Sequence, residues 1–369
     1  MSTETLSQPT EAEYSLLRLT SADGPVYRSV KRVPLRDARP DEVPLIDVSG
    51  MFSNSLVERQ AVATQIHAAA TTSGFFYVKN HGVPSSLIEA AHRSSLEFFR
   101  QPDEIKQKVN SSHSQWFNGW KPPQTQRINN AESIDVRETF STRYNPVEDP
   151  AVTDVDAIPE DIKRFFRYEE FCWEKTSNLP HFKEDIVNYW RACLMFARSL
   201  LHTFALALSL PEDYFDQKTT HPDASIALNY YPSMTKTPTI TAEEQVSIGS
   251  HTDFQFFTIL WQDQSGGLQV LNHGGEWINA SPIKDTFVVN IGDYLMRITN
   301  DRYISTVHRA KNYSGKERIS MPFFFGFNLN ETCGVLPSCV DDKHPAKYEP
   351  ISCEEWVRRR FQATKVDSK

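Results

Sequence analysis

The sequence has 369 residues, a formal net charge of −8 and five cysteines, and no run of Lys or Arg stands out. This charge argues against nucleic acid or an anionic membrane surface as the main partner, and no segment approaches the ~18 consecutive apolar residues of a membrane-spanning helix. The N-terminus lacks the apolar segment of a secretory signal, and the cysteines form no CxxC pair. We therefore expect a monomeric cytoplasmic protein with reduced thiols.

The first half of the chain predicts helices mixed with short strands. Residues 1–40 are polar and contain several prolines, so we expect a flexible N-terminal arm. Apolar spacing and turn residues then predict, in chain order, a strand at 43–48, a helix at 55–72, a strand at 75–78, a helix at 85–99, a strand at 135–140 and a long helix at 180–210 that ends before Pro211.

The stretch between residues 100 and 160 is rich in loops and aromatic side chains, among them Trp116, Phe117 and Trp120. It either reaches over the mouth of the β-structure as a lid or forms a surface loop anchored by its aromatic residues. The sequence does not choose between these two arrangements.

From Ala224 onward the pattern changes to short β-runs separated by turns. The expected strands lie at 226–231, 256–261, 268–271, 286–290, 303–307 and 321–325. Many short strands at this spacing predict a mainly β fold with flanking helices and a jelly-roll core. We expect one catalytic domain at 41–369, with a helical and strand region at 41–223 that carries the lid-like insert, a β-core at 224–330 and a tail with a last helix at 331–369.

Three residues of this β-core have the composition of a facial triad. His251 and Asp253 are two positions apart, so on a strand both side chains point to one face. His308 follows at the end of the expected strand 303–308, which a jelly roll would bring face to face with the first. Two imidazoles and one carboxylate suit Fe(II) and leave three coordination positions open.

Arg318 and Ser320 follow His308 and would share one face of a strand. Arginine offers a charged fork for a carboxylate, and serine adds a hydroxyl donor. The pair therefore suits the far carboxylate of a small dicarboxylate whose keto-acid end occupies two metal positions, with the third left for dioxygen. The alternative is a structural arginine that pairs with an internal acid.

The chain resembles the 2-oxoglutarate- and Fe(II)-dependent dioxygenases of the isopenicillin N synthase-like family. The resemblance covers residues 42–330 and rests on Gly74 to Val83, Asn229-Tyr230-Tyr231-Pro232, His251-Thr252-Asp253, Gly266-Gly267-Leu268, Val288 to Asp293, Ser305 to Arg309 and Arg318-Ile319-Ser320. It implies a double-stranded β-helix core with His251, Asp253 and His308 as iron ligands. It also implies that Arg318 and Ser320, together with Tyr231 and Asn229, contact 2-oxoglutarate.

This resemblance implies an enzyme of secondary or small-molecule metabolism. It would use Fe(II), 2-oxoglutarate and O2, aided in vitro by ascorbate, to oxidise an unactivated C–H bond of a small organic molecule, with release of succinate and CO2. The outcome is hydroxylation, desaturation or cyclisation. Candidate substrate-facing residues are Phe254, Phe324, Thr139 and Ser141, for which core packing is the alternative. Two other functions stay open: an oxidase of the same family that uses no 2-oxoglutarate, and a non-catalytic binding protein on the same fold.

Overall fold

The computed structural model describes residues 13–233 and 245–365. Its α-helices are α1 (Leu56–Thr72), α2 (Ser85–Phe99), α3 (Asp103–Lys106), α4 (Glu160–Lys163), α5 (Phe171–Glu174), α6 (Phe182–Ala207), α7 (Asp293–Ile298) and α8 (Cys353–Lys365). Short 3-10 turns are η1 (Ser49–Phe52), η2 (Gln107–Val109), η3 (Ser111–His113), η4 (Pro146–Glu148), η5 (Asp216–Lys218) and η6 (Pro337–Cys339).

Two sheets form the centre of the molecule. The larger runs in the order β4 (Leu45–Asp47), β5 (Phe75–Lys79), β13 (Thr286–Ile291), β10 (Phe257–Gln262), β15 (Arg318–Phe325), β8 (Ala224–Tyr231), β7 (Glu138–Thr142) and β6 (Gly119–Lys121). The smaller runs in the order β3 (Arg36–Asp37), β12 (Trp277–Asn279), β11 (Leu268–Leu271), β14 (His308–Ala310) and β9 (Ile248–His251). The predicted mainly β fold with a jelly-roll core is confirmed, although the two sheets are mixed and do not close into a barrel.

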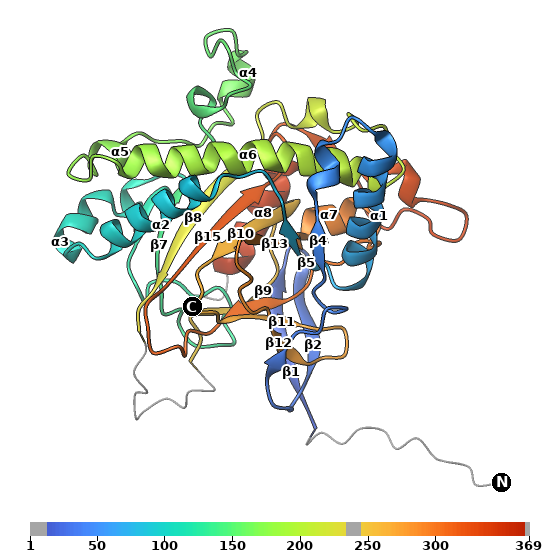
Figure 1. The fold of residues 1–369 in the computed structure, drawn as a ribbon, viewed down its shortest axis with the longest axis horizontal. Coiled ribbons are helices and arrows are strands. Elements are labelled where there is room, and N and C mark those ends of the chain that lie inside the picture. Colours follow the sequence, from blue (N-terminus) through green and yellow to red (C-terminus); the bar gives the residue numbers. More distant parts are fainter. Residues whose placement is uncertain (1–12, 234–244, 366–369) are drawn as a thin grey trace.

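The long helix α6 lies across the larger sheet, with α1 and α2 beside it (Figure 1). Its buried face carries apolar side chains at helical spacing, including Ile186, Trp190 and Leu194, and these join the same core as Ile319 and Phe323 of β15. The negative charges of Glu184 and Asp185 in its first turn interact favourably with the positive end of the helix dipole. The helix ends at Ala207, as the downstream proline predicts.

The N-terminal segment differs from the expected flexible arm, whose residues 1–12 lie outside the described ranges. Strands β1 (Tyr14–Ser21) and β2 (Gly24–Lys31) pair as a hairpin. Leu19 and Val30 are buried against Leu271 and Val307 of the smaller-sheet region, and this burial holds the hairpin in place. Because residues 1–40 are mostly polar, their sequence did not predict these few apolar contacts.

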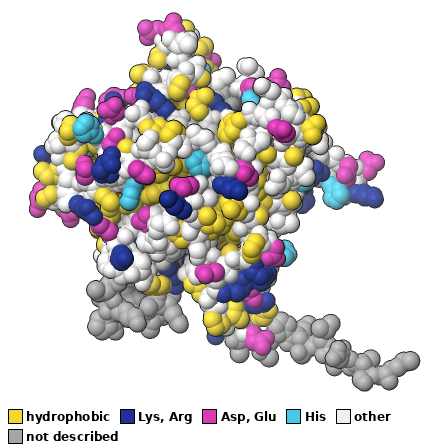
Figure 2. Space-filling view, viewed as in Figure 1, with side chains coloured by type: hydrophobic (Ala, Val, Ile, Leu, Met, Phe, Trp, Pro, Cys, Tyr) yellow, Lys and Arg dark blue, Asp and Glu magenta, His cyan; other side chains and the backbone are white. Residues whose placement is uncertain are grey.

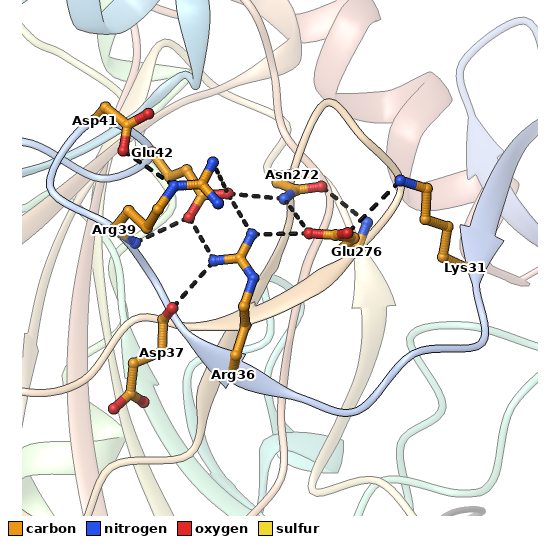
Figure 3. Close-up of polar contacts among 8 residues, drawn as sticks. All are labelled: Lys31, Arg36, Asp37, Arg39, Asp41, Glu42, Asn272 and Glu276. Atoms are coloured by element: carbon orange, nitrogen blue, oxygen red, sulfur yellow. Dashed lines mark hydrogen bonds and ion pairs between the residues drawn. The ribbon is translucent and has the colours of Figure 1, made fainter.

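A network of charged side chains ties the next segment to the smaller sheet (Figure 3). Arg36 donates to both Glu42 and Glu276, at 2.7 and 2.8 Å, and Asn272 donates to Glu42 at 2.9 Å. The hydrogen bonds from Arg36 lower the pKa of Glu42 to about 2. The segment around β3 is thus fixed to the strands that lead to His308.

One expected strand of the β-core is wrong. The segment 303–307 is not a strand, because it bonds to the end of α1 instead: Ile304 N donates to Ala70 O, and Thr306 Oγ1 to Ser73 O. Strand β13 is followed directly by helix α7. Gly292 precedes that helix, and a Cβ there would lie 2.3 Å from Gln255 O, so only glycine fits.

Within the insert at 100–160, β6 and β7 extend the larger sheet. The expected strand at 135–140 is shifted to 138–142, since Val136 N donates to Val246 O and Asp135 Oδ1 accepts from Gly249 N of β9 instead. All five cysteines are free and buried. On the face shown in Figure 2, acidic and basic side chains are interspersed.

Candidate active site

A cavity of ≈ 660 Å³ lies between the two sheets. His251 and His308 enter it from the smaller sheet, where the two residues stand directly opposite each other on β9 and β14. They are therefore neighbours within one sheet, whereas the sequence suggested strands face to face. Their ring centroids are 4.3 Å apart.

Asp253 completes the group from two residues beyond the end of β9, so it does not share a strand face with His251 as expected. The backbone instead turns, and Asp293 N donates to Asp253 O at 2.8 Å. Asp253 Oδ1 lies 3.7 Å from Nε2 of each histidine, and one ligand atom from each of the three residues lies within 4.8 Å of the others.

Each member of this triad has its remaining polar atom occupied. His251 Nδ1 lies 2.8 Å from Gly249 O, and His308 Nδ1 lies 3.1 Å from Thr306 O. Asp253 Oδ2 accepts hydrogen bonds from Thr258 Oγ1 at 2.5 Å and Asn290 Nδ2 at 2.8 Å. The atoms left over are the two Nε2 atoms and Asp253 Oδ1, which face one another.

The charge states of His251 and Asp253 also suit a cation. Burial lowers the pKa of His251, and the nearby His308 lowers it further, so its imidazole is neutral at neutral pH. Burial alone would raise the pKa of Asp253, but the two histidines and the hydrogen bonds from Asn290 and Thr258 lower it overall. Neutral imidazoles and an ionised carboxylate are the protonation states that bind a divalent metal.

Arg318 lies in the same cavity, 1% exposed, on β15 of the larger sheet. Its Nε donates to Gly266 O, its Nη2 to Gln262 Oε1 at 3.1 Å, and its guanidinium lies over the ring of Tyr231 at 4.6 Å. Its Nη1 is buried and has no hydrogen-bond partner among the described residues. A buried donor of this kind is costly unless a ligand accepts from it.

Ser320 and Tyr231 stand beside this arginine. The Tyr231 hydroxyl lies 3.1 Å from Ser320 Oγ, and Asn229 Nδ2 donates to Ser320 Oγ at 3.5 Å. All four residues line the cavity together with the triad. The arrangement thus combines a three-donor metal site with a buried, positively charged anion site.

Comparisons with known proteins agree with this geometry. A family model described as the 2OG-Fe(II) oxygenase superfamily matches residues 222–327, and one described as the N-terminal part of non-haem dioxygenases in morphine synthesis matches residues 43–169. A protein of Metarhizium majus named 2-oxoglutarate-Fe(II) type oxidoreductase ppzC is 53% identical over 349 residues, covering 94% of this chain and 93% of its own.

The chain belongs to the 2-oxoglutarate- and Fe(II)-dependent oxygenases. A full-length Neurospora crassa protein, crystallised in complex with alpha-KG, has a TM-score of 0.72 and 25% identity, covering 89% of this chain and 100% of that one. A Caulobacter crescentus protein described as a member of the 2OG-Fe(II) oxygenase family gives the same TM-score and identity, with coverage of 87% and 98%. The cofactors of this oxygenase are therefore Fe(II) and 2-oxoglutarate.

The residues that line the cavity of this oxygenase fit both Fe(II) and 2-oxoglutarate. Three inward-facing N and O donors match the ligand preference of Fe(II) and leave open positions. The unsatisfied Nη1 of Arg318 matches a carboxylate, and a fully buried cation is stable only when it is paired.

The four residues expected to face substrate all line the cavity of this oxygenase. Thr139 and Ser141 lie on β7, Phe324 on β15 and Phe254 just after Asp253. Phe254 packs edge-to-face on Phe361 of α8 at 5.6 Å. The C-terminal helix therefore forms part of the cavity wall, a contribution that its own sequence did not signal.

Sequence reasoning missed Thr258, Asn290, Arg137 and Arg143, which also line the cavity. Asn290 lies within one of the motifs that carry the family resemblance, but its support of Asp253 depends on strand register. Two-residue alternation along β7 would have pointed to both arginines.

Proposed function

We propose that this oxygenase oxidises an unactivated C–H bond of a small organic molecule in secondary or small-molecule metabolism, by hydroxylation, desaturation or cyclisation. The 660 Å³ cavity has room for the cosubstrate and a second small molecule. The observation that carries the proposal is the buried Nη1 of Arg318, which has no hydrogen-bond partner within residues 13–233 and 245–365 and lies in the same cavity as the triad.

In this proposal His251, Asp253 and His308 hold the iron. Asn290 and Thr258 occupy the second oxygen of Asp253 and so direct its first oxygen toward the metal. The two backbone carbonyls on the histidines fix each ring with Nε2 toward the centre. The bound iron and 2-oxoglutarate supply the oxidising power by activating O2, with release of succinate and CO2.

Arg318 and Ser320 bind the far carboxylate of 2-oxoglutarate, and Tyr231 and Asn229 hold Ser320 and the guanidinium in position. Phe254 and Phe324 line the cavity with apolar surface, which excludes water from the reacting centre. Thr139 and Ser141 present hydroxyl groups to the substrate.

We also propose that residues 41–369 form one catalytic domain of a monomeric, cytoplasmic protein without a nucleic-acid or membrane partner. One apolar cluster joins α1, α2, α6, the larger sheet and α8, which supports the single domain. The net charge of −8 supports the lack of a nucleic-acid partner. None of the helices in residues 13–233 and 245–365 has the length and apolar character needed to cross a bilayer.

The test is an assay of purified protein with Fe(II), ascorbate, O2 and 2-oxoglutarate, in which succinate is followed across a panel of small molecules. We expect slow succinate formation without substrate and faster, stoichiometric formation with one class of compound. Substrate turnover without succinate would contradict the proposal and favour an oxidase that takes all its electrons from the substrate. Binding without any turnover would favour a non-catalytic binding protein.

A further inference from the structure

Strand β7 presents a polar stripe to the cavity. Arg137, Thr139, Ser141 and Arg143 stand at every second position, and all four line the cavity. The residues between them face away, since Glu138 accepts from Lys106 and Trp120, and Phe140 is fully buried in the core. The period of two follows from the strand pleat, so the stripe runs along the cavity as guanidinium, hydroxyl, hydroxyl, guanidinium.

The two ends of this stripe differ in how their guanidinium groups are satisfied. Arg137 Nη1 donates to Asn229 at 2.6 Å, and its Nη2 lies 3.6 Å from Asp135 Oδ2. Arg143 donates only through Nε, to Trp116 O at 3.2 Å. Its two terminal nitrogens have no hydrogen-bond or ion-pair partner among the described residues. The end of the stripe at Arg143 is therefore an open anion site.

Charged groups of both signs surround Arg143. Arg167 also lines the cavity, with its guanidinium 5.0 Å from the Trp116 ring, and it forms an ion pair with Glu354 at 4.0 Å. Asp223 faces the pair, but one of its oxygens already accepts from Gln255 Nε2. Burial lowers the pKa of Arg143, Asp223 counteracts this and Arg167 adds to it. A bound anion would relieve both effects that disfavour the charged guanidinium.

The strand register places this anion site in line with the iron end. Thr142 stands opposite Ile226, so Arg143 follows in the row of Ser225, and Ser225 is opposite Phe324, which is opposite Thr258. Thr258 is the residue that bonds to Asp253. Three strand spacings of ~4.8 Å separate the backbones of Arg143 and Thr258 by roughly 14 Å. A small molecule held at Arg143 can thus reach across the sheet toward the triad.

Aromatic side chains also line this cavity. Phe117, Phe254, Phe324 and Phe361 line the cavity, and Phe361 stacks on Phe117 at 5.6 Å and meets Phe254 edge-on. Aromatic side chains bind apolar ligands through large contact areas. The cavity therefore joins an anion site to an aromatic wall.

We propose that the substrate is an organic carboxylate with an apolar body, whose carboxylate is bound by Arg143 with Arg167 beside it. This inference rests on the proposed function, since it concerns the second molecule in the same cavity. It assigns the carboxylate on Arg318 to 2-oxoglutarate and the one on Arg143 to substrate. Thr139 and Ser141 lie between the two arginines of the stripe.

The experiment is isothermal titration calorimetry on the full chain loaded with Fe(II) and 2-oxoglutarate without oxygen. The probes are ω-phenyl alkanoic acids of two to six methylene groups and the matched primary amides. We expect at least one acid to bind roughly 10- to 100-fold more tightly than its amide, as a charge-assisted pair predicts. In Arg143→Gln this preference should disappear while the amide affinity stays the same. Arg143→Lys should keep part of the preference.

Arg164→Gln is the matched control, because Arg164 is exposed on a neighbouring segment outside the cavity lining. It should retain the full acid preference. The visible charge-transfer absorption of the Fe(II)–2-oxoglutarate complex is recorded before each titration. Without that band the proposed function fails, and this inference with it. If the band forms but acids and amides bind alike, or an acid preference survives in Arg143→Gln, this inference alone is overturned.

Discussion

The iron end and the substrate end of the cavity differ in how far their polar groups are satisfied before any ligand binds. At the iron end, both Nδ1 atoms and one Asp253 oxygen have protein partners, so three donor atoms converge without rearrangement. At the substrate end, the terminal nitrogens of Arg143 lack partners among the described residues. In our proposal, the iron end is preorganised by the protein, whereas the substrate end is completed by the ligand.

The largest effect should come from His251→Ala, which removes one of three donors from the preorganised end. Even the loss of a residue that supports a metal ligand weakens metal binding by roughly 10- to 100-fold, so losing the ligand itself should exceed this and abolish turnover. Iron content after dialysis and succinate formation are the measurements. His202→Ala is the control, because His202 lies on α6, outside the cavity lining, and pairs there with Asp216. Retained iron in His251→Ala would show that the ligand set is wrong.

Helix α8 contacts the loop around Asp253 through Arg360, which pairs with Asp293. We expect Arg360→Met to destabilise the fold. Arg360 is 2% exposed, lies 3.0 Å from Asp293 Oδ2 and donates to Thr20 O at 2.8 Å. Breaking a buried pair leaves an uncompensated charge, at a cost of about 3–5 kcal/mol in the free energy of unfolding. Urea unfolding measures this.

Arg359→Met gives the matched comparison on the same helix. Arg359 is 46% exposed and pairs with Glu355 at the surface, so its loss should change the unfolding free energy by less than about 1 kcal/mol. Equal destabilisation by the two variants would mean that the buried pair with Asp293 has no special role in holding the loop around Asp253.

Arg318→Gln should weaken 2-oxoglutarate binding roughly 10- to 100-fold, since a charge-assisted pair to a buried carboxylate is worth about 1.5–3 kcal/mol. Anaerobic titration followed by the visible absorption of the Fe(II) complex measures the dissociation constant. Arg100→Gln is the control, because Arg100 is 59% exposed and pairs with Glu317 next to Arg318. An unchanged dissociation constant in Arg318→Gln would show that 2-oxoglutarate does not bind to this arginine.

The smallest effect is expected at the charged network outside the iron end. The folded pKa of Glu42 is about 2, below its usual 4.5, so its contribution to stability is present above pH 4.5 and is lost as the pH falls toward 2. Glu42→Gln should lower the unfolding free energy by about 1 kcal/mol at neutral pH and reduce its decline between these pH values. A pH series of urea unfolding midpoints is the measurement. An unchanged pH profile would show that the pair with Arg36 contributes nothing.

The same difference between the two ends explains what the sequence predicts. His251, Asp253, His308 and Arg318 stand at a characteristic spacing, so sequence alone can propose them as site residues. Their geometry could not be predicted from the sequence, because Asp253 lies beyond the end of β9 and the two histidines are paired in one sheet. The supports Thr258 and Asn290 are ordinary strand residues whose role depends on register.

The fold shows a similar division. The apolar spacing of the long helix at 182–207 is strong, so sequence locates it within a few residues. The hairpin at 14–31 is stabilised by a few apolar contacts with distant residues, which no local pattern reveals. Arg143 was missed because the strand expected at 135–140 ends before it, although the two-residue alternation that includes Thr139 and Ser141 leads to it.

An anaerobic crystal structure with Fe(II) and 2-oxoglutarate tests the central claim most directly. The account predicts one metal bound by His251, Asp253 and His308, with the far carboxylate of 2-oxoglutarate on Arg318 Nη1 and Ser320, and with the terminal nitrogens of Arg143 still unoccupied by the cosubstrate. Metal bound by other residues, or the far carboxylate of 2-oxoglutarate seated on Arg143, would contradict it.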